Sequence, residues 1–201
     1  MTDPMIRIGH CSPDAPNVDI QVDGETAFED VGFRDLSDYT SLAPGEHMVR
    51  IKPAGSTDTV IELNASLDED TRYTALATGM LDDIEATVFV DDPGDVPTGK
   101  AHVRFIHASP DAPRVGISVR DGPDLFKRQQ FRSASDYEQV DAGSYDLDVI
   151  PTGNREPALS LDGIEFSGGA AYSAIAVGLV EDGSLDALLV EDTVAELAAD
   201  D

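Results

Sequence analysis

The side chains most capable of chemistry are a histidine, a serine and an aspartate that recur with the same spacing. They lie in two segments of the pattern His-x-Ser-Pro-Asp-Ala-Pro and are His10, Ser12, Asp14, His107, Ser109 and Asp111. An imidazole and a carboxylate this close can hold a cation or a polar ligand. Because a zinc site needs three or four protein ligands, other loops would have to supply the remaining ones.

The same segment also has the composition of a turn. A serine hydroxyl can cap backbone groups, Pro13 and Pro110 fix φ near about −65°, and an aspartate can accept from N–H groups nearby. Pro16 and Pro113 then prevent a helix and favour an extended chain. The sequence therefore favours a structural role for the segment, with a ligand site as the alternative.

Arginine and aromatic residues recur as well. Arg7 and Arg104 precede the two histidines in a chain that is poor in basic residues. We expect each to pair with a carboxylate of its own copy, for which Asp19 is a candidate in the first, although the second has Gly116 there. The aromatic residues that recur are Phe33, Tyr39, Phe131 and Tyr137, and they fit either core packing or an exposed loop that grips a carbohydrate or a peptide.

No catalytic or cofactor signature accompanies these residues. The sequence lacks a G-x-S-x-G elbow, an H-E-x-x-H pair, a P-loop and a G-x-G-x-x-G turn. Acidic clusters such as Asp91-Asp92 lack the spacing of a calcium loop and are interpreted as solvated faces or turns. Cys11 is the single cysteine, and Ala108 takes its place in the second copy, which predicts a small buried residue. We therefore expect no enzyme and no cofactor, with a hydrolase as a minor alternative.

The repeated segments belong to a repeat that spans the chain. Residues 6–22 and 103–119 share ten of seventeen positions, and Tyr73-x-Ala-x-Ala-x-Gly matches Tyr172-x-Ala-x-Ala-x-Gly later on. Between the copies lies a stretch rich in Pro, Gly and Asp, which is typical of a linker. The sequence predicts a first repeat at 1–92, a linker at 93–101, a second repeat at 102–192 and an acidic tail at 193–201.

The periodicity within each repeat is two, which is that of strands. Val18, Ile20 and Val22 alternate with polar residues and lead into an Asp-Gly turn, and Tyr73–Leu81 is apolar on both faces, like a central strand. The sequence predicts an all-β chain of two tandem antiparallel β-sandwich modules, Ig-like or transthyretin-like, with about seven strands each. Pro44-Gly45 and Ala142-Gly143 are predicted hairpin turns, and 194–199 is the only expected helix.

The chain is strongly acidic. Forty Asp and Glu against 13 Lys and Arg give a formal net charge of −27, without any basic cluster in the sequence. Nucleic acid and anionic membranes are therefore excluded as expected partners. Scarce lysine and acid spread along the whole chain resemble the proteins of extreme halophiles, in which salt screens self-repulsion. The alternative is an acidic protein that binds a cation or a basic partner.

The location of the protein depends on what precedes Met1. The first residues have no basic and apolar stretches of an export signal, and no run of about 18 apolar residues occurs. We expect a cytoplasmic protein if the chain is complete, and an extracellular or cell-surface one if a signal was removed. Asn64 begins a glycosylation sequon, which matters only outside the cell.

The paired motif, followed by an alternating Val-x-Ile-x-Val strand and Asp-Gly, resembles the DUF4397 family, a domain of unknown function. The resemblance covers roughly residues 6–91 and 102–192 and suggests a tandem pair from a halophilic archaeon. It implies a β-sandwich found in exported or cell-surface proteins of bacteria and archaea, and no established activity.

The functional prediction is a non-catalytic surface or scaffold module that binds a protein or a glycan. The alternatives are a protein that binds a small ligand or a cation, available in high salt, through the repeated His and Asp, and a hydrolase with a site built from both modules.

Overall fold

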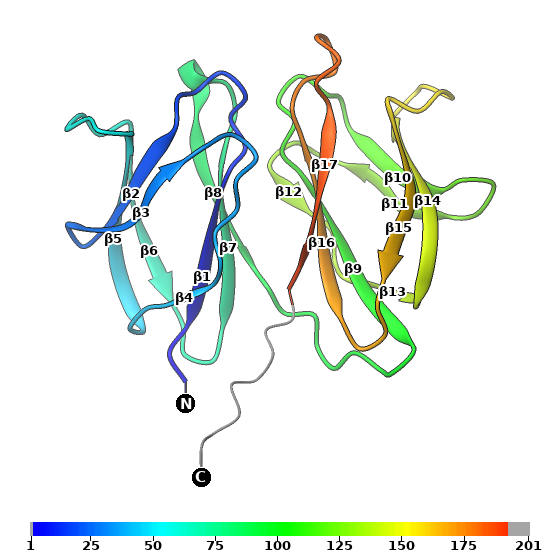
Figure 1. Ribbon diagram of the computed structural model, residues 1–201, viewed down its shortest axis with the longest axis horizontal. Coiled ribbons are helices and arrows are strands. Elements are labelled where there is room, and N and C mark those ends of the chain that lie inside the picture. The colour runs from blue at the N-terminus through cyan, green and yellow to red at the C-terminus, as the bar shows by residue number, and fades with distance from the viewer. Residues whose placement is uncertain (1, 193–201) are drawn as a thin grey trace. The chain divides into compact units, whose positions relative to one another are not determined.

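The computed structural model describes residues 2–192, which form an all-β protein of two compact units (Figure 1). One unit is built mainly from the residues up to Asp92 and the other mainly from Pro93–His107 and Ala112–Ala176. The predicted β-sandwich class is confirmed. The expected helix at 194–199 and the acidic tail lie outside the described residues.

The first repeat consists of two four-stranded sheets with the orders β4-β1-β7-β8 and β3-β2-β5-β6. A short 3₁₀ turn, η1 (Leu81–Asp83), lies between β7 and β8. The strands are β1 (Met5–His10), β2 (Val18–Val22), β3 (Glu25–Val31), β4 (Thr40–Ser41), β5 (Gly45–Pro53), β6 (Ile61–Leu67), β7 (Arg72–Thr78) and β8 (Glu85–Val90).

The second repeat has the same plan, with the orders β12-β9-β16-β17 and β11-β10-β14-β15, and with β13 also paired to β9. Its strands are β9 (Lys100–His107), β10 (Val115–Val119), β11 (Asp124–Gln129), β12 (Ser133–Ala134), β13 (Glu138–Asp141), β14 (Gly143–Pro151), β15 (Leu159–Phe166), β16 (Ala171–Val177) and β17 (Asp186–Glu191). The described strands thus slightly exceed the expected seven per repeat, because β4, β12 and β13 are short edge segments.

One pairing in each repeat is parallel. The first strand, β1, runs beside β7 from Met5 opposite Arg72 to His10 opposite Ala77, and β9 runs beside β16 in the same way. The other pairings of the first repeat are antiparallel, as are those of β9 with β12 and β13, of β10 with β11 and β14, and of β14 with β15. The central position predicted for the strand after Tyr73 is confirmed, since β7 lies between β1 and β8 and is largely buried.

The predicted hairpins at Pro44-Gly45 and Ala142-Gly143 are wrong. The short strand before Pro44 pairs with β1, whereas β5 after it belongs to the other sheet. The second repeat repeats this arrangement, because β13 pairs with β9 and β14 pairs with β10 and β15. Each turn therefore carries the chain from one sheet to the other, which a local turn signal cannot distinguish from a hairpin.

The predicted linker also differs from the structure at its end. Lys100 and Ala101, assigned to the linker at 93–101, are the first residues of β9. Ala101 is fully buried opposite Val140, and Lys100 forms an ion pair of 2.6 Å with Asp141. The small apolar side chain of Ala101 is a core residue of the second repeat.

The inward side chains of both sheets form the core of each repeat. In β2 the three apolar residues are buried and the two polar ones between them are half-buried, as the alternation predicts. In the first repeat these strands bring Ile20, Ile51 and Ala77 into one cluster, and in the second Phe105, Val149 and Phe166 share another.

Candidate functional site

The histidine of each motif is a buried structural residue at the end of the first strand. In the first repeat the His10 Nε2–H donates to the carbonyl of Pro16 over 3.0 Å, and Nδ1 accepts from the Ser12 N–H over 3.2 Å. His107 binds the carbonyl of Pro113 in the same way. Burial lowers the pKa of both imidazoles, so the neutral form predominates. Each ring ties together the loop that follows it.

The motif aspartates are exposed residues that cap the turn after the central strand. Asp14 accepts from the N–H of Leu81, the first residue of η1, over 2.8 Å. Asp111 accepts from two N–H groups, those of Val180 and Glu181, over 2.9 and 2.8 Å. The motif therefore clips the loop after the first strand to a turn about 67 residues later in the chain.

The motif serines differ between the repeats although both are fully buried. The Ser109 hydroxyl donates to the carbonyl of Gly178 over 2.7 Å. The Ser12 hydroxyl has no hydrogen-bond partner among the described residues. Cys11 beside it is buried, as predicted, and burial raises the pKa of its thiol to about 12, which keeps the thiol protonated.

Apart from the Ser12 hydroxyl, the side chains of the candidate ligand site, which are His10 and Asp14 and the counterparts His107, Ser109 and Asp111, are engaged in hydrogen bonds of the fold. Across residues 2–192, no group of three or more His, Cys, Asp and Glu side chains is arranged to hold a metal ion. The cation or ligand reading of the motif stays a prediction, and a ligand would have to displace the backbone groups now bonded to these side chains.

A second set of repeated polar residues forms a buried network in each repeat. Arg7 donates from Nε to the Thr74 hydroxyl over 2.9 Å, and that hydroxyl donates to the Asp91 carboxylate over 2.7 Å. The Tyr39 hydroxyl donates to the same carboxylate oxygen over 2.7 Å, while its ring lies 4.7 Å from the Arg7 guanidinium carbon. The arginine is therefore stacked on an aromatic ring and linked to a buried carboxylate.

The second repeat contains the same network with one substitution. Arg104 donates to the Ser173 hydroxyl over 2.7 Å, which donates to Asp192 over 2.8 Å. Tyr137 donates to Asp192 over 2.8 Å and lies 4.9 Å from the Arg104 guanidinium carbon. All of these side chains are at least partly buried, and the arginines are 3% and 2% exposed.

Two sequence predictions are corrected by this network. Asp91, directly after the edge strand β8, is 4% exposed and accepts from Thr74 and Tyr39, so it is not part of a solvated acidic cluster. Asp19 is not the carboxylate of the arginine network. The sequence contained a signal, because an acidic residue follows the repeated Tyr-x-Ala-x-Ala-x-Gly segment in both copies: Asp91 lies 12 residues after Gly79, and Asp192 lies 14 residues after Gly178.

Asp19 instead binds the backbone of two neighbouring turns. Its carboxylate accepts from the N–H of Asp30 over 2.9 Å and from the N–H of Gly55 over 3.0 Å. These two backbone bonds lower the pKa of the Asp19 carboxyl, so it remains ionised. The carboxylate thus fills a small anion-binding concavity formed by main-chain amides.

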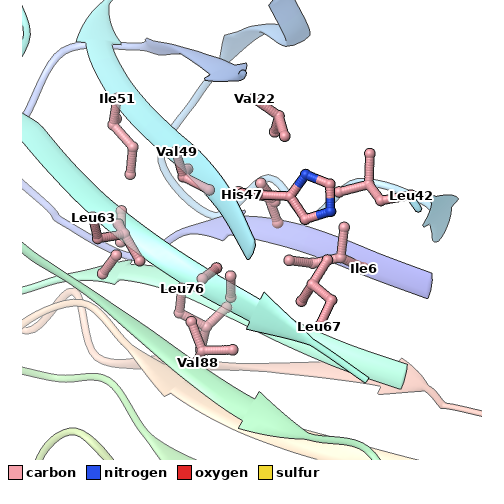
Figure 2. Close-up of a pocket in the computed structure, with 15 residues that line it drawn as sticks. Ile6, Val22, Leu42, His47, Val49, Ile51, Leu63, Leu67, Leu76 and Val88 are labelled. Atoms are coloured by element: carbon pink, nitrogen blue, oxygen red, sulfur yellow. The ribbon is translucent and has the colours of Figure 1, made fainter. Parts of the chain in front are cut away.

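An interior cavity of about 30 Å³ lies between the sheets of the first repeat. Figure 2 shows aliphatic side chains around it, with the His47 ring at one end near Leu42. An apolar cavity of this size stays dry and costs about 0.7 kcal/mol of stability. Larger rings occupy the corresponding core of the second repeat: Phe105 stands where the first has Ile8, and Phe166 where it has Leu67.

His47 lies at a buried position of β5, and its ring is the polar group of this cavity. Nδ1 lies 2.7 Å from the Asp23 carboxylate and Nε2 lies 2.7 Å from the carbonyl of Ala43. Because both partners accept, both contacts are hydrogen bonds only when the imidazole is protonated. The carbonyl of Ala43, and then Asp23, raise the pKa of His47. In the second repeat the Tyr145 hydroxyl donates to the corresponding carbonyl, that of Asp141, over 2.8 Å.

The family assignment follows from the repeated motif and its identical placement in two sandwiches. The sequence matches the family described as "Domain of unknown function (DUF4397)" over residues 4–118 and 119–201. The chain belongs to this family. The junction of the two DUF4397 matches falls inside β10, whereas in the structure the second repeat begins with β9.

The other comparisons add little about function. No curated protein matches the sequence. Among solved structures, the chain is similar to one titled "Crystal structure of CBMbc (family CBM26) from Eubacterium rectale Amy13K in Complex with Maltoheptaose", with 10% identity, a TM-score of 0.30, and coverage of 97% of this chain and 99% of that chain. A similarity this low carries no argument about ligands. Within the described part of the chain, no helix is long and apolar enough to cross a membrane.

Proposed function

We propose that the protein is a non-catalytic tandem β-sandwich that acts as a surface or scaffold module and binds a protein or a glycan through its exposed loops and sheet faces. One observation carries the proposal. The polar side chains that recur in both repeats, the motif histidines and aspartates and the buried arginines, are bonded within their own repeat. They therefore hold a rigid framework, and binding is left to the surface that differs between the repeats.

The proposed setting is a halophilic archaeon, with the module outside the cell or at its surface. The support is compositional: a net charge of −27 on 201 residues is favourable where concentrated salt screens repulsion. The alternative, a small-ligand or cation site at the motif, draws its support from the Ser12 hydroxyl, which is buried without a hydrogen-bond partner among residues 2–192.

Calorimetry on the wild type and on the double variant Asp14→Ala, Asp111→Ala separates these functions. The ligands are Ca²⁺, Zn²⁺ and a panel of glycans. Under the proposal, neither cation binds and the double variant retains any glycan affinity of the wild type. Its amides at Leu81, Val180 and Glu181 exchange faster, since each loses its acceptor.

A control variant removes a carboxylate that serves no turn. Asp95 is exposed, and Asp95→Ala should change neither amide exchange nor binding. If the double variant stays folded but loses a ligand of micromolar affinity that Asp95→Ala keeps, the motif is a ligand site and the scaffold proposal is wrong.

A further inference from the structure

The concavity that Asp19 fills in the first repeat has an open counterpart in the second. Gly116 takes the place of Asp19, opposite Ile150 in β14 as Asp19 is opposite Lys52 in β5. The backbone conformation is retained at the two residues that supply the amides: φ is 54° at Arg128 and 53° at Asp30, and 95° at Gly153 and 72° at Gly55. The amides of Arg128 and Gly153 are thus placed like those that hold the Asp19 carboxylate, and Gly116 has no carboxylate to offer them.

The packing of β10 against β11 leaves no room for a side chain at Gly116. A Cβ at Gly116 would lie 2.7 Å from the carbonyl oxygen of Phe126, so a side chain there requires the backbone to shift. The structure has instead an open cleft of about 340 Å³ at this place, bordered by Gly116, Lys127, Arg128 and Gly153 among others. The second repeat therefore has the concavity and the room for a ligand outside it.

The charge around this place is inverted between the repeats. Asn17, Glu29 and Asp30 of the first repeat correspond to Arg114, Lys127 and Arg128 of the second, and Arg155 follows the cleft residue Asn154. All four basic residues are exposed. They are four of only 13 in the chain, gathered at one end of β10, β11 and β14. The acid in the cleft, Asp124, is bound by the Ser118 hydroxyl at 2.7 Å and by Lys127 at 3.5 Å.

We propose that this cleft binds a carboxylate, and that its natural occupant is an aspartate side chain of an acidic peptide segment. The first repeat shows the chemistry, since an aspartate there accepts from both amides and stays ionised. Arg128 and Lys127, which stand where the first repeat has Asp30 and Glu29, add charge attraction. The inference rests on the proposed binding function and gives it a site and a class of partner.

The test is a titration of the ¹⁵N-labelled protein with N-acetyl-aspartate amide at fixed ionic strength, followed by NMR. The amide signals of Arg128 and Gly153 should shift and saturate, while those of Asp30 and Gly55, whose concavity is filled, should not move. Arg128→Asp installs the residue that the first repeat has at the same positive φ, so the fold tolerates it. It should weaken binding by about tenfold or more, as expected for loss of a charge-assisted contact.

Control variants distinguish binding at this cleft from an effect of the net charge of the whole molecule. Lys52→Glu changes the net charge by the same amount in the first repeat and should leave the affinity unchanged. Lys127→Glu, at an exposed strand position, should weaken binding as Arg128→Asp does. N-acetyl-asparagine amide, which is neutral, should not bind.

Three results would overturn the inference: no shift of the Arg128 and Gly153 amides, equal losses in Arg128→Asp and Lys52→Glu, or saturable binding of glucuronate with none of N-acetyl-aspartate amide. The last would assign the cleft to an acidic sugar. None of them bears on the cation and glycan panel above, so failure of this site and failure of the scaffold proposal remain distinguishable.

Discussion

The buried carboxylate of each network accepts hydrogen bonds from two hydroxyl groups. Asp91→Ala would leave the Thr74 and Tyr39 hydroxyls without their acceptor. It would also remove the negative charge of the network to which the buried Arg7 is linked. We expect the free energy of unfolding of the first repeat to fall by about 3 kcal/mol or more. Urea denaturation followed by the amide signals of β7 measures it, with Asp95→Ala as the control. A loss below about 1 kcal/mol would show that the network contributes little.

His47 makes the first repeat sensitive to pH. Its pKa is raised in the folded state, so its stabilising contribution is present below the pKa of the unfolded chain and is lost as the pH rises through the folded pKa. The first repeat should therefore unfold more easily at mildly alkaline than at mildly acidic pH. His47→Tyr, which installs the residue of the second repeat, should remove that dependence and fill part of the cavity.

Thermal melts of wild type and His47→Tyr across this pH range check the prediction. Tyr145→Phe is the matched control, because it removes a hydroxyl that donates to the carbonyl of Asp141 without involving a group that titrates near neutrality. An unchanged pH dependence in His47→Tyr would assign the effect to another group.

At the scale of elements, the two repeats differ in which member of a contacting residue pair has the large side chain. Gly9 of β1 lies opposite Leu36, and its Cβ would lie 2.6 Å from a Leu36 methyl and 2.7 Å from a Leu76 methyl. In the second repeat the same pair is Ile106 and Ala134, so the bulk lies on the other partner. Gly9→Ile alone should destabilise the first repeat by about 1–3 kcal/mol through overpacking.

Adding Leu36→Ala to Gly9→Ile should recover at least half of that loss. A double-mutant cycle in urea measures the coupling between the two positions. If the effects of the two changes are additive, the clash is relieved elsewhere. The two positions then have no coupling free energy.

Strand identity was predictable from the sequence, and pairing between strands was not. The alternation in Val18–Val22 and the apolar run after Tyr73 identify a half-buried and a central strand, because these patterns depend only on which faces are covered. The parallel partner of β1 and the change of sheet after Pro44 depend on contacts between distant segments. The role of Asp91 could not be predicted for the same reason, because its carboxylate is bound by Thr74 and Tyr39, which lie 17 and 52 residues away in the chain.

The candidate site shows the same division. The turn role favoured for Asp14 and Asp111 is what the structure displays, although the amides they bind lie in a distant turn and not two residues on. No motif in the sequence marks the cleft of the second repeat. The comparison of Asp19 with Gly116 was visible in the sequence, but its meaning required the two amides that surround the carboxylate.

At the scale of the whole molecule, the net charge of −27 should make stability depend on salt. The melting temperature should rise between about 0.1 M and about 2 M KCl, over which the Debye length falls from about 10 Å to below about 3 Å. Trehalose at matched osmolality is the control, since it screens no charge. A melting temperature that fails to rise with KCl would contradict the halophilic setting proposed above.

The parallel pairing of β1 with β7 constrains how this protein can fold. Arg7 and its partner Thr74 are 67 residues apart in the chain, and Arg104 and Ser173 are 69 apart. During synthesis the first strand of each repeat therefore lacks its parallel partner until nearly the whole repeat has left the ribosome, and folding should be slow. Since β1 and β9 share Arg and His at matching positions, a waiting strand can pair with the central strand of the wrong repeat. The difference in size between Gly9 and Ile106 opposes this mispairing, because Ile106 in place of Gly9 would clash with Leu36 and Leu76.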